Sequence, residues 1–265
     1  MKNRSSFVMA LVGALIALAL IPSAFAQSGN AMVRVVHASP DAPAVDVWIN
    51  GSKVDALTNV PFFTASGYLP LPAGSYDILV VPAGQTSPAV IDAKGVTISA
   101  GMAYTIAATG FLSNIQPTIL VDNLSAPEAG KAHVRVIHTS PDAPAVDIRV
   151  AGGPALISNL AFPNASDYLP VDAGTYNLEV TPAGSTTVVL PINGVALEAG
   201  RIYDVFAVGD LANLRVEPVV TTPMAAAAPA PAALPRTSGE TAPVALAALL
   251  ASALVAGGVM LRRRA

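Results

Sequence analysis

The sequence predicts an all-β protein with two tandem immunoglobulin-like antiparallel β-sandwich domains, followed by a C-terminal transmembrane helix. The first observation is a ten-residue motif that occurs twice among the 265 residues. The second is short alternation of apolar and polar residues, broken by Pro and Gly, which is typical of β-strands. The third is an uncharged apolar stretch near the C-terminus. We expect about seven strands in each domain, as in immunoglobulin-like sandwiches.

The two copies of the motif are nearly identical. Residues 37–46 read HASPDAPAVD and residues 138–147 read HTSPDAPAVD, so one position in ten differs. The spacing of 101 residues is much longer than a solenoid repeat and close to the size of a small domain. We therefore expect a first β-sandwich over residues 27–124, a linker over 125–130 and a second β-sandwich over 131–220.

The first two strands of each copy have clear apolar faces. In the first copy, Val33 and Val35 share one face of a strand, and Val45, Val47 and Ile49 share one face of the next. Because side chains alternate between the two faces of a strand, these residues are expected to point into the core.

The polar residues between these valines predict an ion pair. If the two strands form a hairpin, Arg34 and Asp46 lie side by side on the outer face, and Arg135 repeats the contact with Asp147. An exposed cross-strand pair of this kind contributes only about 0.2–1 kcal/mol, so its main role would be to fix the strand register.

A turn is expected between the two strands. Ser39-Pro40-Asp41 has the residue types of a type I turn, and the ring of His37 is expected to bond a turn carbonyl or Asp41. The residues of the repeated motif that we interpret as structural are Arg34, His37, Ser39, Pro40, Asp41, Asp46, Arg135, His138, Ser140, Pro141, Asp142 and Asp147.

Two chemical interpretations of the motif remain as alternatives. An envelope hydrolase would need Ser39 bonded to His37 and a carboxylate, Asp41 or Asp46, that orients the imidazole. The close spacing around a proline turn argues against this, and nothing marks an oxyanion hole. A divalent metal held by the same imidazole and carboxylates, serving surface assembly, is the other alternative. We predict no catalytic residue, no metal ligand and no cofactor.

The N-terminus has the features of a secretory signal peptide. Lys2 and Arg4 precede an apolar stretch, and Ala24-Phe25-Ala26 fits the small-x-small cleavage rule. We expect a signal peptide over residues 1–26, cleaved after Ala26. An uncleaved anchor is less favoured, because the apolar stretch is short for a membrane span.

The C-terminal region has three parts. Residues 221–243 are rich in Ala and Pro and predict an extended stalk. Residues 244–261 carry no charge and would rise about 27 Å as a helix, enough for the core of a bilayer. Residues 262–265 contain three arginines, which favour a cytoplasmic tail and leave the body of the protein outside.

The stalk also contains the sequence LPRTSG at residues 234–239. Its position before an apolar segment and a basic tail resembles the Leu-Pro-x-Thr-Gly sorting signal of sortase substrates, in which a transpeptidase joins the threonine to a cell-wall amine. The resemblance implies Leu234, Pro235 and Thr237 as anchoring residues. Ser238 stands where that family has glycine, so a plain membrane anchor on a flexible stalk is the alternative.

The composition excludes several classes of function. Residues 27–220 carry eight Lys and Arg against 16 Asp and Glu, a net charge of about −8, which disfavours nucleic acid as a partner. The chain contains no cysteine, so it has no disulfide, no thiolate metal site and no cysteine nucleophile. Two domains of this size are large enough to be stabilised by core packing alone.

The repeated run also resembles a known family. Residues 33–46, followed by the Ala-Gly-x-Tyr strand at residues 73–76, are similar to the bacterial family known as domain of unknown function 4397. Because both elements occur twice, the resemblance covers residues 31–220. It implies exported or surface proteins with tandem β-sandwich copies, and it supplies no activity and no site.

These features favour an extracytoplasmic, cell-surface protein that is not an enzyme and that has a binding, adhesion or structural role in the envelope. The expected partners are the membrane, through the C-terminal helix, and the cell wall, through Thr237. A further partner is an extracellular ligand that the sequence does not name.

Overall fold

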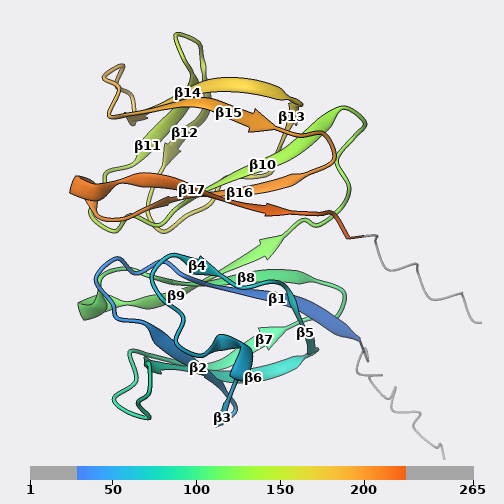
Figure 1. Cartoon of the computed structure of the whole chain (residues 1–265), viewed down its shortest axis with the longest axis vertical. Coiled ribbons are helices and arrows are strands. Elements are labelled where there is room, and N and C mark those ends of the chain that lie inside the picture. Colours follow the sequence, from blue (N-terminus) through green and yellow to red (C-terminus); the bar gives the residue numbers. More distant parts are fainter. Residues whose placement is uncertain (1–28, 225–265) are drawn as a thin grey trace, which may run out of the picture. The chain divides into compact units, whose positions relative to one another are not determined.

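The computed structural model describes residues 29–224. Within this range the chain forms β-strands and three short 3-10 helices, arranged as two β-sandwiches (Figure 1). The expected signal peptide, the stalk with its sorting motif and the transmembrane helix all lie outside the described residues. Between residues 29 and 224, no helix is long and apolar enough to cross a membrane.

The first sandwich has two sheets. One sheet contains β1 (Asn30–His37), β4 (Thr64–Ala65), β5 (Leu69–Pro72), β8 (Ala103–Thr109) and β9 (Gln116–Asp122). The other contains β2 (Val45–Ile49), β3 (Ser52–Lys53), β6 (Gly74–Pro82) and β7 (Ile91–Ile98). The short helices η1 (Asp55–Leu57) and η2 (Leu112–Asn114) lie in loops between strands. The strand number exceeds the expected seven because β3 and β4 are two-residue pairings.

The second sandwich repeats this plan. One sheet contains β10 (Lys131–His138), β13 (Leu169–Asp172), β16 (Ile202–Val208) and β17 (Arg215–Thr221), and η3 (Leu211–Asn213) joins the last two. The other contains β11 (Val146–Val150), β12 (Ala155–Leu160), β14 (Gly174–Pro182) and β15 (Leu190–Leu197). The main difference is that β12 replaces the region of β3 and η1.

The expected hairpin between the first two strands is wrong. β1 and β2 belong to opposite sheets, and β1 instead runs parallel to β8, with Val35 opposite Ile106. β10 runs parallel to β16 in the same way. Each sandwich is therefore mainly antiparallel with one parallel pair, and the proline turn crosses from one sheet to the other.

The expected inward faces are confirmed despite this change of partner. Val33, Val45 and Val47 are buried in the core of the first sandwich, and Val35 packs against it. Alternation of apolar and polar residues decides which face of a strand points into the core. The same faces are therefore buried whether the two strands pair in one sheet or lie in opposite sheets of a sandwich.

The opposite face of β1 is buried as well. Val36 packs with Ala107 of β8 and with Ile137 and Phe206 of the second sandwich. All seven residues of β8 are buried. The sheet that contains β1 and β8 is thus covered on one face by its own sandwich core and on the other by the second sandwich.

Candidate functional site

The histidines of the repeated motif close the turn that follows β1 or β10. His37 lies 3.0 Å, through its Nε2, from the carbonyl oxygen of Pro43, while its Nδ1 accepts from the backbone N–H of Ser39. This pattern fixes the neutral imidazole with its proton on Nε2. Burial lowers the pKa of His37, which favours the same form. His138 makes the equivalent contact with Pro144 at 3.1 Å. The expected bond from ring to turn carbonyl is confirmed.

The serine and aspartate of the turn serve separate purposes. Ser39 is completely buried, and its Oγ has no hydrogen-bond partner among the described residues. Asp41 accepts a hydrogen bond from the backbone N–H of Leu112 at 2.7 Å, and Asp142 does the same with Leu211 at 2.8 Å. Each aspartate therefore holds the start of a 3-10 helix, η2 or η3.

A catalytic triad is not assembled by these residues. A triad requires a serine hydroxyl bonded to the imidazole and a carboxylate on the other ring nitrogen. Here both nitrogens of His37 contact backbone groups, and the carboxylate of Asp41 faces a helix terminus. Residues 29–224 also contain no group of three or more His, Asp or Glu that could hold a metal ion.

The second aspartate of the motif organises loops. Asp46 is buried and accepts hydrogen bonds from the backbone N–H groups of Asn59 at 2.7 Å and Gly84 at 2.9 Å. Lys53 donates a third bond at 2.7 Å. The bond from Lys53, followed by the two backbone bonds, lowers the pKa of Asp46 to about 2. Asp147 holds the equivalent loops of the second sandwich.

The expected exposed ion pairs of Arg34 with Asp46 and Arg135 with Asp147 are therefore wrong. Each arginine lies on the sheet opposite to its expected partner, and both residues point away from the core that separates the sheets. Arg34 and Arg135 are almost fully buried instead of exposed. Asp46 is also buried, so the expectation of a surface network fails for it too.

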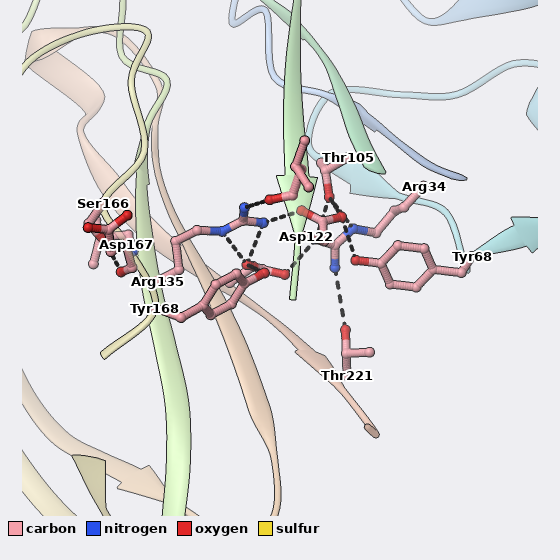
Figure 2. Close-up of polar contacts among 12 residues, drawn as sticks. Arg34, Tyr68, Thr105, Asp122, Arg135, Ser166, Asp167, Tyr168 and Thr221 are labelled. Atoms are coloured by element: carbon pink, nitrogen blue, oxygen red, sulfur yellow. Dashed lines mark hydrogen bonds and ion pairs between the residues drawn. The ribbon is translucent and has the colours of Figure 1, made fainter. Parts of the chain in front are cut away.

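The arginines meet in a charge cluster between the two sandwiches (Figure 2). Arg34 of β1 pairs with Asp204 of β16, and Arg135 of β10 pairs with both Asp122 of β9 and Asp204. The distance from Arg135 Nη2 to Asp204 is 2.8 Å. Two positive and two negative side chains thus balance inside the protein. We call Arg34, Asp122, Arg135 and Asp204 the charge cluster.

Neutral side chains complete the hydrogen bonding of the charge cluster. Tyr68 donates to Asp122 at 2.7 Å and Tyr168 donates to Asp204 at 2.9 Å. Thr105 accepts from Arg34 and donates to Asp122 at 2.6 Å. Burial raises the pKa of both tyrosines, so they remain protonated donors. Buried charges need this degree of satisfaction, because desolvation otherwise outweighs their attraction.

The guanidinium groups also stack on the same tyrosines. Arg34 lies 4.9 Å from the ring centroid of Tyr68, and Arg135 lies 4.5 Å from that of Tyr168. Burial disfavours the charge of Arg135, but Asp204 and Asp122 together raise its pKa. The four side chains of the charge cluster are therefore paired with one another and closed to solvent.

The two sandwiches contribute to the charge cluster in nearly the same way, but their aspartates stand at different positions. Arg34 is in register with Thr105, whereas the equivalent Arg135 is in register with Asp204. The acidic residue of the first sandwich is Asp122 instead, at the position that Thr221 holds in the second. Each sandwich thus contributes one arginine and one aspartate. The arginines come from the equivalent strands β1 and β10, whereas the aspartates come from the non-equivalent strands β9 and β16.

Sequence reasoning missed the acidic half of this cluster. The repeat identified Arg34 and Arg135, because both copies have arginine at this position. It did not identify Asp122 or Asp204, because the equivalent position in the other copy is a threonine in each case. One signal was available: Val36 and Ile137 place apolar side chains on the same strand face as the arginines, which is unusual for a solvated face. That pattern indicates a sheet covered on both sides.

The fold and the contacts of the motif define a tandem β-sandwich protein whose repeated polar residues hold turns, loops and the boundary between the two sandwiches. The chain belongs to the family described as domain of unknown function (DUF4397), which matches residues 31–149 and 150–234. The resemblance of residues 31–220 to this family, noted from the sequence, is thereby confirmed.

Comparison with solved structures gives weak similarities. The crystal structure of the CBM26-family domain CBMbc from Eubacterium rectale Amy13K, in complex with maltoheptaose, is 10% identical and covers 76% of this chain and 98% of that one, with a TM-score of 0.24. The Bacillus anthracis TIE protein is 13% identical and covers 69% of this chain and 34% of that one, with a TM-score of 0.20. At these TM-scores neither similarity informs function. A search of curated proteins found no match.

Proposed function

We propose that this chain is an exported, surface-anchored protein that acts by binding or as a structural component of the envelope, with its two immunoglobulin-like sandwiches presented as one unit. The observation that carries the proposal is the charge cluster, which joins the two sandwiches through buried ion pairs. A joined pair displays the loops of both sandwiches in a fixed relation, which suits the recognition of an extended partner.

The polar residues of the repeated motif support a role without catalysis. The imidazole of His37 and the carboxylate of Asp41 are engaged by backbone groups, and Ser39 is inaccessible to a substrate. No specific observation favours the hydrolase or the metal-dependent alternative.

Anchoring is the part of the proposal that rests on sequence alone. The signal peptide over residues 1–26 delivers the chain outside the cytoplasm, and residues 244–261 hold it at the membrane. Transpeptidation at Thr237 would move it to the wall. The stalk over residues 221–243 separates the sandwiches from either anchor.

Mass spectrometry of the native C-terminus, taken from separated wall and membrane fractions, tests the anchoring. A chain that ends at Thr237 with an attached wall fragment identifies a sortase substrate, and a chain intact through Ala265 in the membrane fraction identifies a plain anchor. An intact chain recovered only from the cytoplasm would contradict the proposal.

The binding role is tested by adsorption of the protein to isolated envelopes. The double variant Ser39→Ala and Ser140→Ala should bind as the wild type does, because neither hydroxyl contacts solvent or has a hydrogen-bond partner within residues 29–224. Turnover of an envelope substrate that disappears in this double variant would instead establish the hydrolase.

A further inference from the structure

The second sandwich contains a large apolar cavity between its two sheets. The cavity has a volume of about 710 Å³, and its walls include Val136 of β10, Ile148 of β11, Leu178 of β14 and Val205 of β16. The matching space in the first sandwich is about 40 Å³. Protein interiors are normally packed without voids much larger than a water molecule, whereas ligand pockets span about 300–1,000 Å³.

A local difference in chain path accompanies this contrast. In the first sandwich, η1 places Leu57 in the core, where it is only 2% exposed. In the second sandwich the chain continues as strand β12, paired with β11, and no helix lies between them. Leu156 of β12 lines the cavity and is 45% exposed, which places an opening of the cavity at this edge.

Core residues of the second sandwich reflect the same difference. Leu178 and Val205 are partly accessible, whereas the equivalent Ile78 and Ile106 of the first sandwich are buried. The two sheets of the second sandwich still pack together, with Val136 of one beside Ile148 and Val180 of the other, but their apolar side chains are less completely buried than in the first sandwich. This arrangement suits an apolar guest held between two preformed sheets.

The histidine in the walls offers a guest no open hydrogen-bonding atom. His138 is 1% exposed, and its Nε2 contacts the carbonyl oxygen of Pro144. Its Nδ1 has no hydrogen-bond partner among the described residues, but it is also closed to the cavity. The contact surface that His138 presents to a guest is therefore apolar.

The remaining polar groups narrow the class of guest. The hydroxyls of Tyr176 and Tyr203 also belong to cavity-lining residues, but they already bond the backbone of Asp172 and Glu198. Among the residues that the structure describes, no Lys or Arg lines the cavity, and the one charged residue in its lining is Asp172. An anionic headgroup would lie near Asp172 and without a positively charged partner, so a neutral guest is favoured.

We propose that the second sandwich is a binding site for a neutral, mainly aliphatic molecule, such as a long-chain alcohol, which fills this apolar cavity. The site goes beyond the surface role proposed above and does not depend on how the chain is anchored.

Photolabelling of the mature full chain in phospholipid nanodiscs tests the site. A long-chain alcohol that carries a diazirine is bound, irradiated and mapped by peptide mass spectrometry. We expect saturable labelling of β11, β14 and β16, reduced by competing dodecanol and not by dodecanoate. The first sandwich, with its 40 Å³ space, is the internal control. Equal labelling of both sandwiches, or labelling that dodecanol does not reduce, would overturn the proposal.

Variants of the walls separate the cavity from other apolar surfaces. Val205→Trp should fill the cavity and abolish labelling, and Ala207→Leu provides a smaller change at the same wall in case the first variant does not fold. Leu211→Ser removes an exposed apolar side chain outside the cavity and should change nothing. Labelling that persists in a folded filling variant contradicts the site.

Discussion

Removing one carboxylate from the charge cluster should destabilise the joined sandwiches more than any surface change. Asp204 is fully buried and accepts bonds from Arg34, Arg135 and Tyr168. Asp204→Asn keeps the size of the side chain but leaves two guanidinium groups to share one remaining carboxylate, Asp122. Breaking a buried ion pair in this way costs about 3–5 kcal/mol.

This loss is large against the stability of a folded domain, which is about 5–15 kcal/mol. If the free energy of unfolding falls by about 2 kcal/mol per molar urea (the m-value), a loss of about 4 kcal/mol of stability lowers the urea midpoint by about 2 M. Because the cluster lies between the sandwiches, we also expect the two to unfold separately in the variant. Trp48, the only tryptophan, reports on the first sandwich, while circular dichroism reports on both.

The assay therefore compares two midpoints in each protein. Wild type should show coincident fluorescence and dichroism transitions, and Asp204→Asn should show lower and separated ones. Asp92→Asn makes the same chemical change at an exposed 2.9 Å ion pair with Lys94 and should leave both midpoints nearly unchanged, because solvent screens such pairs. If the two variants behave alike, the charge cluster does not join the sandwiches.

Three further predictions concern the motif and one glycine. The carboxylate of Asp46 stabilises the fold at pH values above its unfolded pKa of about 3.9, and this stabilisation is lost as the pH falls towards its folded pKa of about 2. Between these two pH values, the stability of Asp46→Asn should therefore fall less with decreasing pH than the stability of wild type does. The melting temperature of Ser39→Ala should match or exceed that of wild type, because the buried hydroxyl has no hydrogen-bond partner in the described part of the chain. A clearly lower melting temperature would show that the hydroxyl does form a stabilising bond. Gly209→Ala should lower the melting temperature far more than Gly152→Ala does. Both glycines have positive φ, but only at Gly209 would an added Cβ lie 2.4 Å from a backbone oxygen, that of Asn213. Equal decreases in the two variants would contradict this reasoning.

The sequence predicted the local features of the fold better than its pairing. Alternation alone indicated that Val33, Val45 and Val47 are buried, and the repeat alone indicated two similar sandwiches. Alternation carries no information about which strand lies beside which, so the partner of β1 was wrong. Placing Arg34 beside Asp46 followed directly from the assumed hairpin.

The site could be predicted only where its chemistry is local. The bond of His37 to Pro43 spans six residues, and turn preferences were enough to anticipate it. The pairing of Arg34 with Asp204 spans 170 residues and joins two domains, so no local pattern contains it. The cavity depends on the difference between η1 and β12, which is visible only when the two copies are compared in space.

Positions that are identical in the two copies have different roles from positions that differ between them. The ten-residue motif is nearly identical in both, and its side chains hold the turn, the loops and a 3-10 helix within each sandwich. The positions that differ build what a single sandwich lacks: Asp204 in place of Thr105 and Asp122 in place of Thr221 complete the charge cluster, and β12 in place of η1 accompanies the cavity. Identity between the copies therefore marks the fold, whereas functional residues of this chain should be sought where the copies diverge.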